Sequence, residues 1–145
     1  MDELLNALQE AFAAYRQELE AAQKKRKPTD GLLGFGNSIK DDPCHERFDE
    51  RVAQAVSAIA AAQPSPTDAR RVVRLLLIRD DLQAWHLSAQ WMLRAAERHA
   101  LPLIPFLSRE AAAELSEEYT GRYKRWERLP VQKQVIKALK ASAKA

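Results

Sequence analysis

The sequence predicts an all-α fold, a single-domain bundle of five or six helices with a long glycine-containing loop between the first two. Apolar residues recur at steps of three and four along most of the chain, the spacing of one helix face. Prolines and capping residues divide the chain into segments of helical length, and no two segments show the alternation that paired strands require. The 145 residues are 46% apolar and 30% charged with 4 glycines, which excludes fibrous and wholly disordered chains. We therefore expect residues 1–145 to form one helical domain.

The first helix is expected over roughly the first 25 residues. It ends in a basic run before Pro28, because cations favour the negative end of the helix dipole and proline cannot continue the helix. Residues 28–42 hold three of the four glycines and no helical period, so we expect a long loop there. Loops of this length in compact domains are usually functional or mobile. The apolar stripe of the first helix consists of Leu5, Leu8, Phe12, Tyr15, Leu19 and Ala22.

The second helix is expected to begin at Asp42 and Pro43, which supply an N-terminal acceptor and a proline at the first helical position. The third begins at a capping box, residues 65–68, and extends to about Arg79. Residues 72–78 are also compatible with a buried strand, but the preceding cap favours a helix. The predicted core positions are Cys44, Phe48, Val52, Val56 and Ile59 in the second helix and Ala69, Val72, Val73 and Leu76 in the third.

A fourth helix is expected over residues 82–100, capped by Asp80 or Asp81. Its polar side chains project into one narrow sector, so we expect this helix at the centre of the bundle. Two prolines should keep residues 101–107 from being helical, leaving an apolar cover. The polar sector holds His86, Gln90, Arg94 and Glu97, and the apolar arc holds Trp85, Leu87, Trp91, Met92, Leu93, Ala95 and Ala96.

Ser108 is expected to cap a fifth helix, which Gly121 can break. Its stripe continues to Tyr123 and Trp126, so these aromatic rings are predicted to be buried and not available for stacking on bases. Pro130 opens a last helix, and residues 130–145 form a basic C-terminal segment whose end can fray. Its inward positions are Val135, Ile136 and Leu139, and its outward positions are Lys133, Lys137, Lys140 and Lys144.

Charge is distributed unevenly although the net charge is only +3. The last 25 residues hold eight cations and one acid, so they carry +7 and the first 120 residues carry −4. This polarity suits a phosphate backbone, an anionic lipid surface or an acidic partner protein. The C-terminal lysines are also typical of the solvated face of a terminal helix, which favours solubility. The candidate anion-binding residues are Arg70, Arg71, Arg74, Lys133, Lys137 and Lys140.

The compartment expected from the sequence is the cytoplasm. The single cysteine, Cys44, cannot form an intramolecular disulfide, which fits a reducing interior. The acidic start of the chain does not resemble an export signal. No segment is apolar enough to span a membrane.

The glycine-containing loop partly matches a phosphate-binding P-loop, but Asn37 stands where that motif needs lysine and no strand precedes it. The glycines more simply allow the loop to fold back on the core, and the loop remains a candidate wall for a ligand or partner pocket. The candidate partner or ligand residues are Gly34, Phe35, Gly36, Asn37, Asp41, Asp42 and His45.

Residues 41–49 are also compatible with the active site of a metal-dependent or thiol-dependent enzyme, formed by Asp42, Cys44, His45 and Asp49. Against this alternative, Cys44 falls on the buried stripe, and acids in a first helical turn are what the dipole favours. No catalytic triad, paired-carboxylate motif or CxxC is present. We therefore expect no catalytic residue, no metal and no cofactor.

The leading hypothesis is a non-enzymatic cytosolic helical module that binds another protein, through the long loop and the helix ends beside it. The first alternative is nucleic-acid binding through the arginines at 70, 71 and 74 and the C-terminal lysine face. The second alternative is the enzyme centred on residues 41–49.

Overall fold

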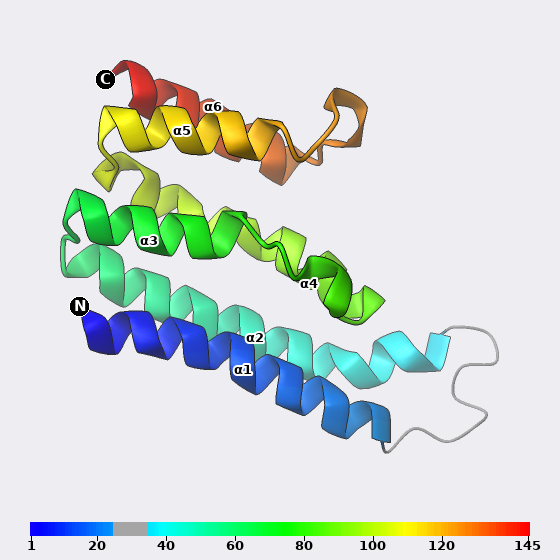
Figure 1. Cartoon of the computed structure of the whole chain (residues 1–145). Helices are drawn as coiled ribbons and strands as arrows, with labels where there is room; N and C mark the ends of the chain where they lie inside the picture. Colours follow the sequence, from blue (N-terminus) through cyan, green and yellow to red (C-terminus); the bar gives the residue numbers. More distant parts are fainter. Residues whose placement is uncertain (25–34) are drawn as a thin grey trace.

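A computed structural model describes residues 1–24 and 35–145, with side chains described for 1–24 and 43–145. Within these residues the chain forms six α-helices and three 3-10 helices and no strand, which confirms the all-α prediction. Figure 1 shows three tiers: α1 beside α2, then α3 with the segment that follows α4, then α5 beside α6.

The first tier consists of α1 (Asp2–Lys24) and α2 (Phe35–Ala61), which run antiparallel (Figure 1). Their apolar stripes meet as predicted. The Tyr15 and Phe48 rings stack with centroids 4.3 Å apart, and Phe12 meets Phe48 edge-on at 5.2 Å. Every predicted stripe residue of α2 is buried, and so is every one in α1 except Ala22, which is half-buried.

The start of α2 differs from the prediction. The helix begins at Phe35, so residues 35–42 are helical and Asp42 and Pro43 lie inside it. An internal proline removes only one backbone donor and disturbs only the preceding turn, so the helix can continue through it. The rest of the predicted loop, residues 28–34, lies outside the described residues.

The predicted start of α3 (Pro66–Leu77) is confirmed. The Ser65 hydroxyl accepts a hydrogen bond from the Asp68 amide at 3.2 Å, and Pro66 takes the first helical position. The helix buries its four predicted core positions. Residues 72–77 are therefore helical, and the strand alternative is not adopted.

The predicted fourth helix was wrong as a single element. Residues 82–100 divide into η1 (Leu82–Ala84), α4 (Leu87–Ala95) and the start of η2 (Ala96–Phe106). Trp85 and His86 between η1 and α4 have extended backbone, with ψ of 152° and 149°. The Asp81 carboxylate does not cap a helix but accepts a hydrogen bond from the Trp85 indole at 3.0 Å.

This break places the following residues on different faces from those predicted. A projection at 100° per residue holds only along one uninterrupted helix. In the structure Leu87 and Trp91 are 78% and 69% exposed, whereas Glu97 is 3% exposed. Two residues of the predicted apolar arc, Leu87 and Trp91, are thus exposed, and one residue of the predicted polar sector, Glu97, is buried.

The central element is η2, which the sequence predicted to be an extended cover from residue 101 onward. It contacts α2, α3, α4 and α6, and it buries Ala100, Leu103 and Ile104. A 3-10 helix has three residues per turn, so Pro102 and Pro105 share one face, and both are exposed.

The last tier consists of α5 (Arg109–Thr120) and α6 (Pro130–Lys144), with η3 (Arg125–Glu127) between them. Ser108 caps α5 as predicted, accepting from the Ala111 amide at 3.1 Å, and α5 ends at Gly121. Because α5 ends there, its buried stripe stops short, and Trp126 is 80% exposed instead of buried. The predicted inward and outward positions of α6 are confirmed.

No helix in the described part of the chain is both long and apolar enough to cross a bilayer.

Candidate functional site

Most of the predicted loop site cannot be compared with the structure. Gly34 lies outside the described residues. Phe35, Gly36, Asn37, Asp41 and Asp42 belong to the helical backbone of α2, and their side chains lie outside the description. The partial P-loop match falls in the same stretch.

The described members of the predicted metal or thiol site point in different directions. The Cys44 thiol is buried in the core, with the Arg47 guanidinium 3.7 Å from its sulfur. The Nδ1 atom of His45 lies 2.5 Å from the Tyr15 hydroxyl oxygen in α1. Both Asp49 oxygens accept from Arg98 at 2.7 Å, and His99 Nε2 is 2.8 Å from one of them. The structure therefore uses Asp49 to join α2 to η2, and residues 1–24 and 43–145 hold no cluster of three or more metal-ligating side chains.

The predicted arginines of α3 are engaged with carboxylates. Arg74 donates two hydrogen bonds to Glu118 of α5, at 2.5 and 2.9 Å. This contact raises the pKa of Arg74 and lowers that of Glu118. Arg70 lies 3.5 Å from Glu114 of α5, and Arg71 lies 3.7 Å from Asp68. These arginines thus connect α3 to α5 or stay within α3.

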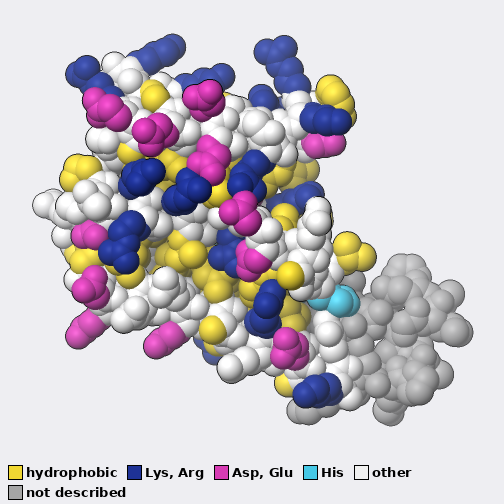
Figure 2. All heavy atoms as spheres, in the orientation of Figure 1, with side chains coloured by type: hydrophobic (Ala, Val, Ile, Leu, Met, Phe, Trp, Pro, Cys, Tyr) yellow, Lys and Arg dark blue, Asp and Glu magenta, His cyan; other side chains and the backbone are white. Residues whose placement is uncertain are grey.

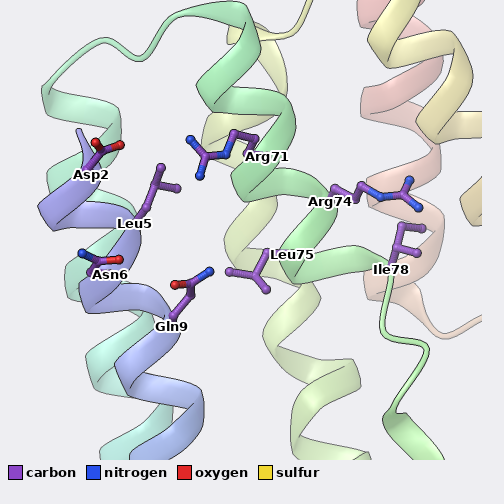
Figure 3. Close-up of a pocket in the computed structure, with 8 residues that line it drawn as sticks. All are labelled: Asp2, Leu5, Asn6, Gln9, Arg71, Arg74, Leu75 and Ile78. Atoms are coloured by element: carbon purple, nitrogen blue, oxygen red, sulfur yellow. The ribbon is translucent and has the colours of Figure 1, made fainter.

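A hollow of about 670 Å³ lies between α1 and α3, and its lining includes Arg71 and Arg74 of α3 together with polar residues of α1. Figure 3 shows Arg71 pointing toward α1 and Arg74 pointing away from it. Because Arg74 is turned toward α5, only the guanidinium of Arg71 faces α1. The remaining residues that line the hollow are Asp2, Leu5, Asn6, Gln9, Leu75 and Ile78.

A buried polar network around Glu97 was missed by the sequence analysis, which placed this residue in a solvated sector. The Glu97 carboxylate accepts hydrogen bonds from the hydroxyl groups of Tyr119 and Tyr123, the latter at 2.6 Å, and from Gln132 Nε2 at 3.1 Å. Gln132 Oε1 accepts from the Leu129 amide at 2.8 Å, which holds the first turn of α6. The network therefore ties η2 to both helices of the last tier.

Burial sets the ionisation of this network. Removal from water raises the pKa of Glu97, although its three hydrogen-bond donors oppose that shift. Burial next to Glu97 also raises the pKa of Tyr119 and of Tyr123, so both hydroxyl groups keep their protons and donate. The sequence signal for this network was the pairing of Tyr119 with Tyr123 one turn apart, but their partner is far away in the chain.

A second group missed by the sequence analysis surrounds Trp85. The Arg16 guanidinium lies 4.2 Å from the Trp85 ring centroid, and Tyr15 stacks on the same indole with centroids 5.7 Å apart. Arg79 lies 4.4 Å from the Phe12 ring centroid and pairs with Asp81 at 3.0 Å. Burial lowers the pKa of Arg79. These contacts hold the extended backbone at Trp85.

Two large exposed apolar side chains, Leu87 and Trp91, lie on α4, directly after that extended backbone. Leu87, Trp91 and Arg94 follow one another at steps of four and three, so they share one face of the helix. We call these three residues the α4 stripe. Beside it lies a hollow of about 430 Å³, whose lining includes Arg94, Gln90, Arg122 and Tyr123.

Comparison with protein-family models finds no match, and comparisons with curated proteins and with solved structures find none either.

Because Cys44 is buried, we expect its thiol to react slowly in the folded protein. Because the thiol is 3% exposed, a small disulfide reagent should label it at least about 100-fold more slowly in the native protein than in urea, since labelling requires opening of the core. The measurement is the labelling rate at slightly alkaline pH. Cys44→Ala/Ser57→Cys, with its thiol at an exposed position of α2, is the matched control and should label quickly. Equal native and unfolded rates at Cys44 would favour the thiol-enzyme alternative.

Because the pKa of Glu97 is raised, we expect the stability of the fold to depend on pH. Just above pH 4.5, the ordinary carboxyl pKa, the folded protein still holds the Glu97 proton, whereas the unfolded chain has lost it. The stability from the protonated group is thus complete at low pH and is lost as pH rises through the folded-state pKa. Glu97→Gln removes this loss, so its stability relative to the unmodified protein should rise with pH, by at most about 1.4 kcal/mol per pH unit in that window.

The measurement is urea unfolding of both proteins from pH 4 to pH 8. Glu46→Gln, at an exposed carboxyl of α2, is the control and should follow the unmodified protein. Parallel stability curves for Glu97→Gln and the unmodified protein would show that Glu97 titrates normally.

Proposed function

We propose that this chain is a non-enzymatic helical module that binds another protein through the α4 stripe. The observation that carries the proposal is the exposure of Leu87 and Trp91, 78% and 69%, one turn apart on the same helix. Adjacent large apolar side chains exposed to water are typical of protein-interaction sites. Tryptophan and arginine, both present in the α4 stripe, dominate the binding energy of many interfaces.

The non-enzymatic part of the proposal is supported by the positions of the reactive side chains. Cys44 packs in the core, Asp49 is engaged by Arg98 and His99, and Glu97 accepts hydrogen bonds from three donors. Each of these groups has a structural partner. The α4 stripe, in contrast, has large side chains that face solvent.

Charge complementarity defines the partner that we propose. Arg94 is exposed and forms no salt bridge with a carboxylate of the described residues, although its charge acts on the buried Glu97. Arg122, which pairs with Asp80, lines the hollow next to it. A segment suited to this surface has apolar side chains that cover Leu87 and Trp91 and a carboxylate that pairs with Arg94. We therefore propose an acidic amphipathic helix as the bound segment, a common form of peptide recognition.

The proposed surface extends the expectation from the sequence. That expectation placed the partner contact in the loop at 28–42 and the adjoining helix ends, most of which lies outside the described side chains. In Figure 1, α4 lies at the same end of the molecule as the beginning of α2. A partner held by the α4 stripe would thus approach that end of the fold.

The test uses a labelled amphipathic helical peptide with leucine and phenylalanine on one face and glutamate along its border. We expect binding by fluorescence anisotropy. Trp91→Ala and Leu87→Ser should each weaken it about tenfold or more, as removal of a central interface side chain does. Arg94→Glu should weaken binding of this peptide and strengthen binding of a peptide with a lysine border.

Ala13→Ser, at an exposed position of α1, is the matched control and should bind like the unmodified protein. A scrambled peptide of the same composition should bind far more weakly. Equal binding of the acidic peptide and its scrambled form, or unchanged binding by Trp91→Ala and Leu87→Ser, would overturn the proposal.

A further inference from the structure

A second exposed indole lies in the connection between α5 and α6, among cations. Trp126 of η3 is 80% exposed, the highest exposure among the large apolar side chains of the described core and surface. The Lys124 ammonium lies 5.5 Å from its ring centroid. Lys124 and Arg125 are themselves exposed. We expected this ring to be buried and therefore unable to stack on bases, but it is exposed and open to stacking.

Unpaired positive charge continues from this connection along α6. Lys133, Lys137 and Lys140 are exposed on one face of the helix, which begins three residues after η3 ends. None of them forms an ion pair with a carboxylate in the described residues, whereas Arg70, Arg74 and Arg122 each do. Figure 2 shows Lys and Arg side chains projecting from the edge where Figure 1 places α6.

We propose that this surface binds single-stranded nucleic acid. It consists of Lys124, Arg125, Trp126, Lys133, Lys137 and Lys140, and we call it the Trp126 surface. An unpaired base stacks on the Trp126 ring, while the phosphates lie along the lysines. Aromatic platforms combined with a row of cations are the usual means of binding single strands without sequence preference. The lysines of α6 span about 10 Å of helix, enough to contact more than one phosphate.

The distribution of apolar side chains favours this partner over a membrane surface. A helix that lies on a bilayer presents several large apolar side chains to the lipid, opposite a cationic face. In α6 the apolar side chains Val135, Ile136 and Leu139 are buried in the core, so they cannot enter lipid. Of the large apolar side chains described from η3 to the end of α6, only Trp126 and Leu129 are exposed. A single exposed ring suits stacking better than insertion.

The ring also favours a single strand over a duplex. In a duplex each base is already stacked on its neighbours, so only the phosphates are available to this surface. Binding to a duplex would therefore use the lysines and leave the Trp126 ring without a role. Preference for a single strand is the property that separates this proposal from general attraction to polyanions.

The test uses a labelled 12-nucleotide oligo(dT) and a duplex of the same length, at low salt. We expect the single strand to bind more tightly and to quench tryptophan emission, and we expect its affinity to fall steeply as salt rises. Trp126→Ala should weaken binding about fivefold or more and abolish the quenching. Trp91→Phe, which leaves the Trp126 surface intact, is the matched control and should preserve both.

The lysines are tested separately. Lys133→Gln/Lys137→Gln should reduce the dependence of affinity on salt, because fewer counterions are displaced, while Lys24→Gln on α1 should not. Equal affinity for duplex and single strand, unchanged binding by Trp126→Ala, or binding to anionic vesicles without binding to oligo(dT) would overturn the inference. Peptide binding by Trp126→Ala should stay normal, so this proposal and the protein-binding proposal can fail independently.

Discussion

The hydrogen bond from the Trp85 indole to Asp81 is the contact on which the exposed α4 stripe depends. It holds the buried Trp85 between Tyr15 and Arg16 of α1 while the backbone of Trp85 and His86 stays extended. A new helix can then start at Leu87 with a different rotation about its axis. The same break exposes Leu87 and Trp91 and turns Glu97 into the core, where it meets Tyr119, Tyr123 and Gln132.

Much of the fold was predictable because its signals are local. The stripes of α1, α3 and α6 and the caps at Ser65 and Ser108 depend on residues within a few positions of one another. The break at Trp85 was not predictable in this way, because its causes are Tyr15 and Arg16, far earlier in the chain. The exposure of Trp126 depends on where α5 ends. The apolar spacing in the sequence continues past that end to Trp126, so it predicted a buried ring.

The candidate sites show the same division. Arg70 and Arg74 formed a cationic face in the sequence, but α5 supplies Glu114 and Glu118 to pair with them. The lysines of α6 meet no such partner among the described residues, so the charge asymmetry of the sequence persists there as an exposed surface. Positive charge alone therefore could not distinguish a structural arginine from a surface lysine; the packing of helices distant in sequence makes that distinction.

We propose that the two surfaces together suit a small adaptor. The α4 stripe offers apolar contact next to the exposed guanidinium of Arg94, which suits an acidic protein segment. The Trp126 surface offers one ring next to several ammonium groups, which suits a flexible polyanion. Neither surface includes a catalytic group in our proposals. The reactive side chains Cys44, Asp49 and Glu97 pack in the core or hydrogen-bond to neighbouring helices.

The exposure of Trp91 is the most direct test of this account. Acrylamide quenching of Trp126→Phe, compared with Trp91→Phe/Trp126→Phe, isolates the emission of Trp91 while Trp85 stays in place. We expect Trp91 to be quenched nearly as efficiently as a free indole, because the helix breaks before Leu87. Strong protection of Trp91 in the isolated protein would mean an unbroken central helix, and it would remove the α4 stripe.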